Sequence, residues 1–351
     1  MQNRIDYETR SISDLSEESL TAQVRRLRLR FGGWVANPKW KFNLQLSFSR
    51  SDMDWDDTGF PGIVRDAVII YESSPELQFA FGQTKLPGNR QRVISSGDQQ
   101  FIDRSIVNRQ LNLDRDFGVQ MLFANKLFRG NDSEIPLNFR FAITSGDGRN
   151  SVTAQEPGLM YTARGELLPL GAFKHSGDYS EGDLEYEEDL KLSIGWGYSY
   201  VKNATRTRAN SGVPIGEGRS FGNAFADLVA KWRGISFYAE YMNRIAPAPV
   251  VNGTSAPGTA KTPTTTIFSG EGVNLQAGAF VSETLEIVTR YASTFARGES
   301  RPNIPRNNQW VLGVNRYIQG HRLKVQGDLT YDQVERRGDQ WISRFQVELG
   351  I

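Results

Sequence analysis

The chain has 351 residues, with 41 Lys and Arg against 40 Asp and Glu, so it lacks the basic field on which nucleic-acid-binding proteins depend. Cysteine is absent, which excludes disulfides, cysteine–metal sites and thiol catalysis. Although 11% of the residues are aromatic, no stretch approaches the roughly 18 consecutive apolar residues of a membrane helix. A soluble all-β protein and a membrane β-barrel, whose strands show lipid only alternate residues, both fit these features.

The N-terminus shows no secretory signal peptide, because Met1 is followed by neither a basic start nor an apolar core. Ile5 and Tyr7 already alternate with polar neighbours, as in a strand. We therefore expect the numbering to begin inside the natural protein.

Apolar and polar residues alternate along most of the chain. Between positions 39 and 50, for example, Trp40, Leu44 and Phe48 lie at even positions and polar residues occupy the odd ones. A period of two places the apolar set on one face of a strand. The pattern predicts strands at 1–9, 23–36, 39–50, 63–72, 76–84, 116–126, 136–144, 158–168, 190–201, 221–232, 235–245, 271–281, 284–293, 308–317, 321–332 and 341–351. These lengths suit tilted membrane strands of about 9–11 residues better than globular strands of about 5–6.

The connections alternate between tight turns, such as Arg233-Gly234, and long loops. The long loops lie at 10–22, 51–62, 85–115, 145–157, 202–220, 246–270, 294–307 and 333–340. Outer-membrane barrels show this asymmetry, with short periplasmic turns and long external loops. The connections at 127–135 and 169–189 are longer than expected for the short side, and 246–270 has the composition of a flexible loop.

We predict an all-β fold in one domain, residues 1–351, that forms a transmembrane antiparallel barrel of about sixteen strands in the lipid of the bacterial outer membrane. The alternative is a soluble sandwich, which would need a second sheet to cover the apolar face.

Catalytic and metal-binding motifs are scarce. The two histidines, His175 and His321, have no obvious triad partners and are expected to be exposed polar residues. The acidic run 178–189 offers carboxylates that suit calcium, but it lacks EF-hand spacing, and a solvated acidic turn is favoured. We expect no enzyme activity, no cofactor, no metal and no nucleic-acid partner.

The stretch 25–31 is the densest basic cluster. Its apolar residues share one face of the expected strand, while Arg26, Arg28 and Arg30 share the other, with Arg25 beside them. Successive arginines would line the bore about 7 Å apart and offer an anion several weak binding positions. Alternatively, the arginines are neutralised by carboxylates that the same parity directs into the bore. These are Asp66, Asp116, Glu166, Asp227, Glu240, Glu286, Asp328 and Glu348.

Loop 85–115 is the longest connection and is also basic. It carries Lys85, Arg90, Arg92, Arg104, Arg109 and Arg115 against Asp98, Asp103 and Asp114. Long ordered loops are usually functional, and a wide barrel leaves a lumen to be narrowed. We predict that this loop folds inward as a constriction. The alternative is a loop that caps the outside or packs on a neighbouring subunit.

Several of these segments together resemble the phosphate-selective porin O/P family. They are Arg25–Leu29, Asp66–Tyr71, Phe81–Pro87, Ser95-Ser96, Phe101–Ser105, Asp116–Gln120 and the Gly182-Asp183 turn before Leu190–Tyr200. The resemblance implies a sixteen-stranded, usually trimeric barrel with an inward third loop and a basic pore lining. By matching positions, it implies that Arg25, Arg26 and Arg28 are pore arginines and that Lys85 and Arg104 belong to the loop motif.

We therefore expect a porin for passive diffusion of small hydrophilic solutes that prefers anions, phosphate or similar. Its candidate pore-lining residues are Arg25, Arg26, Arg28, Arg30, Lys85, Arg90, Arg92 and Arg104. The expected partners are outer-membrane lipid, small anions, two further copies in a homotrimer and envelope-complex proteins. The alternative function is a structural or accessory barrel of a larger envelope complex with little channel activity.

Overall fold

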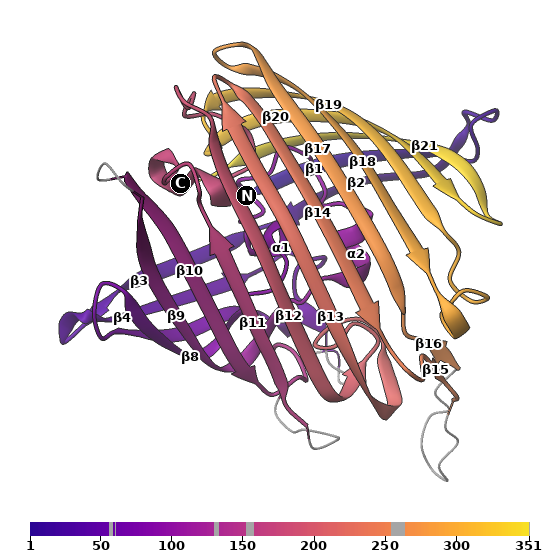
Figure 1. The fold of residues 1–351 in the computed structure, drawn as a ribbon. Helices are drawn as coiled ribbons and strands as arrows, with labels where there is room; N and C mark the ends of the chain where they lie inside the picture. Colours follow the sequence, from indigo (N-terminus) through magenta and orange to yellow (C-terminus); the bar gives the residue numbers. More distant parts are fainter. Residues whose placement is uncertain (56–58, 60, 130–132, 152–157, 254–263, 351) are drawn as a thin grey trace.

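The computed structural model describes residues 1–55, 59, 61–129, 133–151, 158–253 and 264–350. One antiparallel sheet curves into a barrel (Figure 1). Its strands are β1 (Gln2–Thr9), β2 (Glu17–Arg26), β3 (Arg28–Val35), β4 (Asn37–Ser47), β7 (Val64–Glu72), β8 (Leu77–Lys85), β9 (Arg115–Arg129), β10 (Ser133–Thr144), β11 (Met160–Leu167), β12 (Lys191–Arg206), β13 (Pro214–Trp232), β14 (Ile235–Ile245), β17 (Gly270–Ser282), β18 (Leu285–Ala296), β19 (Asn307–Gln319), β20 (Leu323–Val334) and β21 (Gly338–Leu349). Two small hairpins, β5 (Asp54–Trp55) with β6 (Pro61–Gly62) and β15 (Val250–Val251) with β16 (Thr265–Thr266), lie in loops.

The 17 strands of the sheet correspond to the predicted sixteen, because only Leu27 separates β2 from β3 and the two continue one strand. β1 pairs with β2 on one side and with β21 on the other, which joins the first and last strands of the chain. Among the pairings of the described residues, β2 pairs with β1 and β3 with β4, so the hairpins β1–β2 and β3–β4 diverge at Leu27. The predicted all-β antiparallel barrel is confirmed.

Side chains alternate across the wall as predicted. On β19, Leu312 and Val314 are 57% and 45% exposed on the outside, while Val311 is 2% exposed on the inside. An apolar outer face that stays exposed among the described residues is what lipid requires of a membrane strand. No helix within the described ranges is long and apolar enough to cross a membrane.

Several strands extend into the predicted loops. β12 continues to Arg206 and β13 begins at Pro214, so the loop expected at 202–220 is much shorter. The apolar–polar alternation weakens in these extensions, as expected where both faces of a hairpin leave the membrane, and periodicity alone therefore misses them. The loop predicted at 246–270 contains 254–263, which lie outside the described residues.

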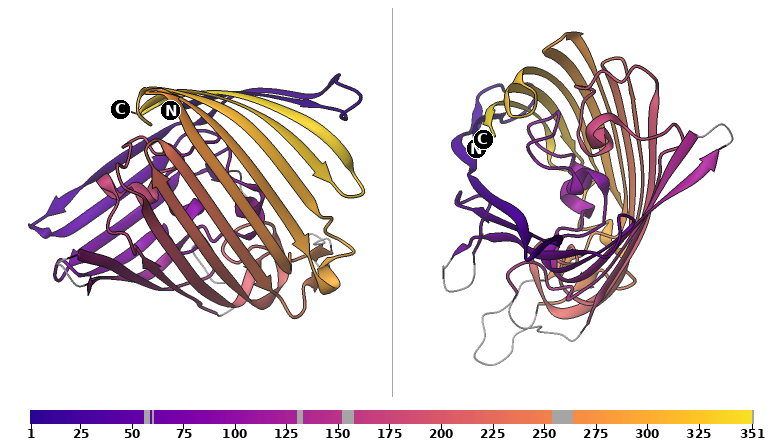
Figure 2. Two further views of the ribbon diagram at one scale, coloured as in Figure 1. Left: turned by 45° about the horizontal axis from the view of Figure 1, so that its top comes forward. Right: turned by 90° about the vertical axis from the view of Figure 1, so that its left-hand side faces the viewer.

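Two connections turn into the bore. The first is residues 86–114, which we call the lumen loop; it contains α1 (Arg90–Val93) and α2 (Ile106–Leu111). Figure 2 shows these helices inside the ring of strands, which confirms the predicted inward fold. The second, which we call the lumen segment, is residues 168–190, with the short helix η1 (Lys174–Tyr179). It enters from the end where the tight turns lie, such as the turn between β13 and β14.

The lipid-facing phase of β19 can be tested with two arginine substitutions. Leu312→Arg places a charge on the lipid face near mid-strand and should destabilise the barrel by about 2–4 kcal/mol. Gln309→Arg is the control, because Gln309 faces inward and its side chain already contacts Asp332 at 2.8 Å. Unfolding in urea after reconstitution into lipid measures both. Equal destabilisation by the two variants would refute the assigned phase.

Candidate pore constriction

Apolar side chains hold the lumen loop against one side of the wall. Five of its buried apolar residues, each at most 4% exposed, are Leu86, Ile106, Val107, Leu111 and Leu113. They share one apolar cluster with inward-facing residues of the wall, which include Ala142, Met160, Val201, Phe221, Met242 and Ala292. α2 packs against β14, β17 and β18. The loop therefore occupies the β10–β18 side of the bore.

Two glycines on β17 allow the lumen loop to touch the wall. A Cβ at Gly272 would lie 2.7 Å from Cγ1 of Val107, and a Cβ at Gly278 would lie 2.1 Å from Nε2 of Gln100. Both distances are well below van der Waals contact, so a side chain at either position would push the loop toward the opposite wall.

Polar contacts attach the far end of the lumen loop to β1 and β20. Arg4 forms two hydrogen bonds with the carboxylate of Asp103, both of 2.8 Å. The ammonium of Lys324 donates to the carbonyl oxygens of Gly97 (2.8 Å) and Gln99 (2.7 Å). The loop thus spans the bore from β8 and β9 to β1 and β20.

Charges on the filled side of the bore compensate one another. Nε of Arg90 lies 2.6 Å from Asp227, and Arg164 lies 2.7 Å from Asp227 and 2.8 Å from Glu166. The side chains of all four residues are at most 1% exposed. Buried charges need such partners, because an unpaired ion in a dry interior is costly. The structure places Arg90 in this closed network and not in the lining of the two basic cavities on the other side of the lumen loop.

Two adjacent cavities remain open on the other side of the lumen loop. The first, which we call the Arg26 cavity, has a volume of about 300 Å³, and its charged lining is Arg25, Arg26, Arg92, Arg104, Arg109, Arg208, Arg290 and Arg344 with Asp103 and Asp114. The second, the Arg30 cavity, has a volume of about 270 Å³, and its charged lining is Arg28, Arg30, Arg65, Lys85, Arg92, Arg104 and Arg115 with Asp66. Arg92 and Arg104 line both cavities. The structure therefore brings together every predicted site residue except Arg90.

Several of these cations have no carboxylate partner among the described residues. Arg26 donates to the amide of Gln2, and Arg30 donates to Oδ1 of Asn43 at 2.9 Å. The other predicted site residues without an ion pair to a described residue are Arg25, Lys85 and Arg104, which donate to backbone carbonyls. In contrast, Arg28 is paired with Asp52 at 2.5 Å, and Arg92 with Asp114. Positive charge thus remains in excess along β2 and β3.

The closely spaced cations create a positive electrostatic potential at the lumen loop. Burial, and then the charges of Arg92, Arg26 and Arg28, lowers the pKa of Arg104 well below its usual range. The same field that disfavours one more cation attracts an anion.

Arg65 is a lining residue that the strand parity missed. Parity directs Asp66 inward and its neighbour Arg65 outward, but both are buried, at 5% and 4% exposure. The register shifts between Gln45 and Leu46, which pair with Asp66 and Val64, so Arg65 is the extra residue of a bulge. A bulge redirects one side chain. The apolar–polar pattern around Arg65 does not indicate the bulge, so the sequence alone could not reveal it.

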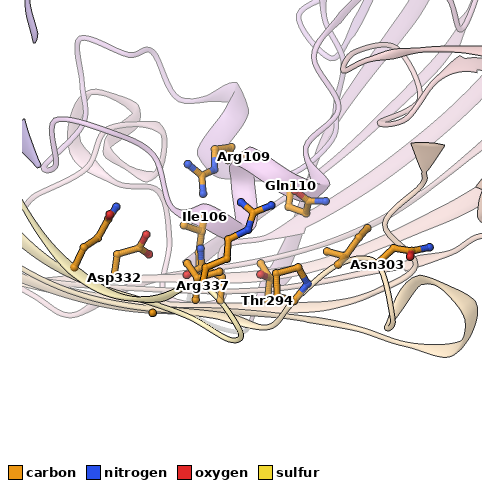
Figure 3. A pocket seen from close by; sticks show the side chains of 13 residues that line it. Ile106, Arg109, Gln110, Thr294, Asn303, Asp332 and Arg337 are labelled. Atoms are coloured by element: carbon orange, nitrogen blue, oxygen red, sulfur yellow. The ribbon is translucent and has the colours of Figure 1, made fainter. Parts of the chain in front are cut away.

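A third cavity, of about 460 Å³, adjoins the Arg26 cavity, since Ile106 and Arg109 line both. Figure 3 shows Arg109 on α2 and Arg337 on the connection between β20 and β21 extending into it. With Asp332 also in its lining, this cavity is less strongly basic than the Arg26 cavity.

The histidines and the acidic run differ in part from the predictions. His175 is exposed as expected, but His321 is partly buried, with Nε2 3.0 Å from the carbonyl oxygen of Glu181 and Nδ1 3.2 Å from Nζ of Lys324. The expectation of an exposed residue is wrong there, because the lumen segment covers this ring. In the part of the chain that the structure describes, no group of three or more potential ligands could hold a metal ion.

The fit of the lumen loop on β17 gives a second test. Gly272→Leu should force α2 toward the open side and lower single-channel conductance in planar bilayers. Gly327→Leu is the matched control, because the nearest neighbour to its added Cβ, outside its adjacent residues, is a backbone oxygen 3.9 Å away. Unchanged conductance in a folded Gly272→Leu barrel would show that the loop does not border the ion path.

The outer apolar face, the tight turns at one end and the inward loop define a membrane β-barrel of the porin class. The chain belongs to the phosphate-selective porin O and P family, whose model matches residues 1–246. It is therefore a protein of the bacterial outer membrane, and its family and fold are those of a channel.

Solved structures of porins share the fold across nearly the whole chain. Salmonella typhi OmpF in complex with daunomycin matches at a TM-score of 0.58 and 13% identity, over 99% of this chain and 95% of that one. An anion-selective porin from Comamonas acidovorans matches at 0.55 and 14%, over 99% and 96%. The channel DcaP of Acinetobacter baumannii matches at 0.53 and 13%, over 99% and 94%. No curated protein sequence matches the chain.

Proposed function

We propose that this protein is a passive channel for small hydrophilic solutes that prefers anions, phosphate or similar. The observation that carries the proposal is the charge of the two adjacent cavities. Eight arginines face two aspartates in the Arg26 cavity, and seven bases face one aspartate in the Arg30 cavity. A solute that passes along β2 and β3 meets cations at each step.

Local clustering outweighs the net charge of the chain, which is only +1. One ion pair at 4 Å and an effective dielectric near 20 amounts to about 4 kcal/mol before desolvation. Carboxylates farther away than about 10 Å are largely screened at 0.1 M salt. Because successive cations share the anion, no single one must hold it tightly, which permits release.

The predicted residues divide by their contacts into three groups. Arg25, Arg26 and Arg30 offer guanidinium groups free of carboxylates and are proposed to contact the anion. Lys85 and Arg104 contribute charge while they hold carbonyl oxygens of the lumen loop. Arg28 and Arg92 are paired, and we assign Arg90 no contact with the solute because it is fully buried.

The lumen loop is proposed as the constriction of a single barrel domain, residues 1–351, that assembles as a homotrimer in outer-membrane lipid. The family resemblance and the description of one similar structure as an anion-selective porin support this proposal. Mobility of the unheated protein in detergent gels tests the trimer.

Removal of unpaired arginines should reduce anion preference. Arg26→Gln combined with Arg30→Gln removes two cavity charges without leaving a carboxylate unpaired, because neither residue forms an ion pair with a described residue. The anion-to-cation permeability ratio, taken from the reversal potential in a salt gradient, should fall by on the order of tenfold. Arg316→Gln is the control, since Arg316 faces outward on β19.

A cation-selective parent channel would overturn the anion proposal. A parent that conducts almost nothing would favour the accessory-barrel function instead. An anion-selective parent whose permeability ratio is equally insensitive to both variants would remove Arg26 and Arg30 from the path.

Anion preference should also depend on ionic strength. The Debye length is about 10 Å at 0.1 M salt and about 3 Å at 1 M. The permeability ratio should therefore fall steadily between these concentrations. A ratio that stays constant would indicate selection by size and not by charge.

A further inference from the structure

The lumen segment is an unusual connection for its end of the barrel. The neighbouring turn between β13 and β14 needs two residues, whereas this connection spans 168–190 and enters the bore. Four of the seven carboxylates in its acidic run are buried, which corrects the prediction of a solvated acidic turn. The buried carboxylates, at most 7% exposed, are Asp178, Glu181, Asp183 and Glu187.

Glu181 joins the lumen segment to the lumen loop. Its carboxylate accepts hydrogen bonds from the backbone N of Gln100 at 2.8 Å and from Nε2 of Gln91 at 3.4 Å. It also accepts one from Nε2 of Gln276 on the wall at 2.9 Å. Its own backbone N donates to the carbonyl oxygen of Asp98 at 2.8 Å. One residue of the segment thus contacts the loop at three positions.

Tyr179 makes a second attachment. Its ring centroid lies 4.9 Å from the guanidinium carbon of Arg90 in the loop and 5.1 Å from that of Arg140 on β10. Its hydroxyl donates to Glu166 on β11. The ring therefore fixes the α1 end of the loop relative to the wall.

A short chain of hydrogen bonds connects Glu181 with Arg104, which lines the basic cavities. Gln91, which donates to Glu181, accepts hydrogen bonds from Oγ of Ser105 at 2.8 Å with its side chain and from Nε of Arg104 at 2.8 Å with its backbone carbonyl. Arg104 lines both cavities, whereas Glu181 lines neither.

The lumen segment itself is anchored at its base. The carboxylate of Asp183 accepts hydrogen bonds from the backbone N of Gly234 at 2.7 Å and of Glu187 at 3.2 Å. The segment is therefore attached to the barrel independently of the loop that it supports.

We propose that the lumen segment is a second inward support that sets the position of the constriction, with Glu181 and Tyr179 as positioning residues for Arg104. This proposal rests on the anion-channel function. It assigns selectivity in part to the periplasmic end of the barrel, although neither positioning residue lines a basic cavity.

The sign of the change in selectivity separates positioning from simple electrostatics. Glu181→Ala removes a negative charge, which by Coulomb's law alone would raise the anion-to-cation permeability ratio. A positioning role predicts a lower ratio. Without Glu181 the lumen loop would be less firmly held, and Arg104 would lie at a less defined distance from the other cations of the cavities. The ratio should fall by about twofold, with higher conductance and more frequent substates. Glu181→Gln, which keeps the shape, should show a smaller fall.

Two further variants control for charge and folding. Tyr179→Leu changes no charge and should lower the ratio in the same direction. Glu185→Ala removes an exposed carboxylate of the same segment, whose hydrogen-bond partner is His175, and should leave the ratio unchanged. Heat-modifiable gel mobility confirms that each barrel is folded. An unchanged or raised ratio in both Glu181→Ala and Tyr179→Leu would overturn the proposal.

Loop position can be measured without any reference to selectivity. Because the chain has no cysteine, a variant with Val93→Cys and Gln45→Cys can be spin-labelled at these two positions alone. Both residues line the Arg30 cavity, so the distance between the labels reports its width. The distance distribution should broaden in Glu181→Ala and not in Glu185→Ala. If the distribution broadens but the parent channel shows no anion preference, the proposed function is wrong and the positioning role of the lumen segment stands. If the distribution stays narrow in Glu181→Ala, the positioning role is wrong.

Discussion

A barrel of this width encloses more space than its own inward side chains can fill, and the arrangement of the bore follows from that constraint. The lumen loop and the lumen segment enter from opposite ends and pack against the same side of the wall. Where they pack, water is excluded, so charges such as Arg90 and Asp227 must pair. Where they do not reach, Arg26 and Arg30 have no carboxylate partner among the described residues and donate only to the amides of Gln2 and Asn43. The two basic cavities are thus the unfilled remainder of this part of the bore, and they need no excess of charge in the whole chain.

The strands of the wall and the row of Arg26, Arg28 and Arg30 were predictable because both follow from the local apolar–polar pattern. Alternation along a strand fixes which side chains face lipid, and it placed Arg26, Arg28 and Arg30 on one inner face together. The length and charge of 85–115 sufficed to predict an inward loop. The strand ends were less predictable, since alternation weakens where both faces leave the membrane.

Features that depend on distant partners were not predictable from one sequence. Arg90 and Arg92 are alike in sequence, yet Arg90 meets Asp227 and is buried, while Arg92 lies between two cavities. The sequence left open whether bore carboxylates neutralise the arginines, and both situations occur, on different sides of the loop. The acidic run looked like a solvated turn because nothing local shows that Glu181 meets Gln91 and Gln100.

The attachment of the lumen loop to both ends of the chain has a consequence for assembly. Asp103 bonds to Arg4, 99 residues away, and Gly97 to Lys324, 227 residues away. Contacts across such separations bear the greatest loop-closure entropy and form late in folding. They also flank the seam at which β1 meets β21. The far end of the lumen loop is therefore held by the same part of the wall that joins the first and last strands of the chain, and until those strands meet, the loop lacks the partners that fix this end.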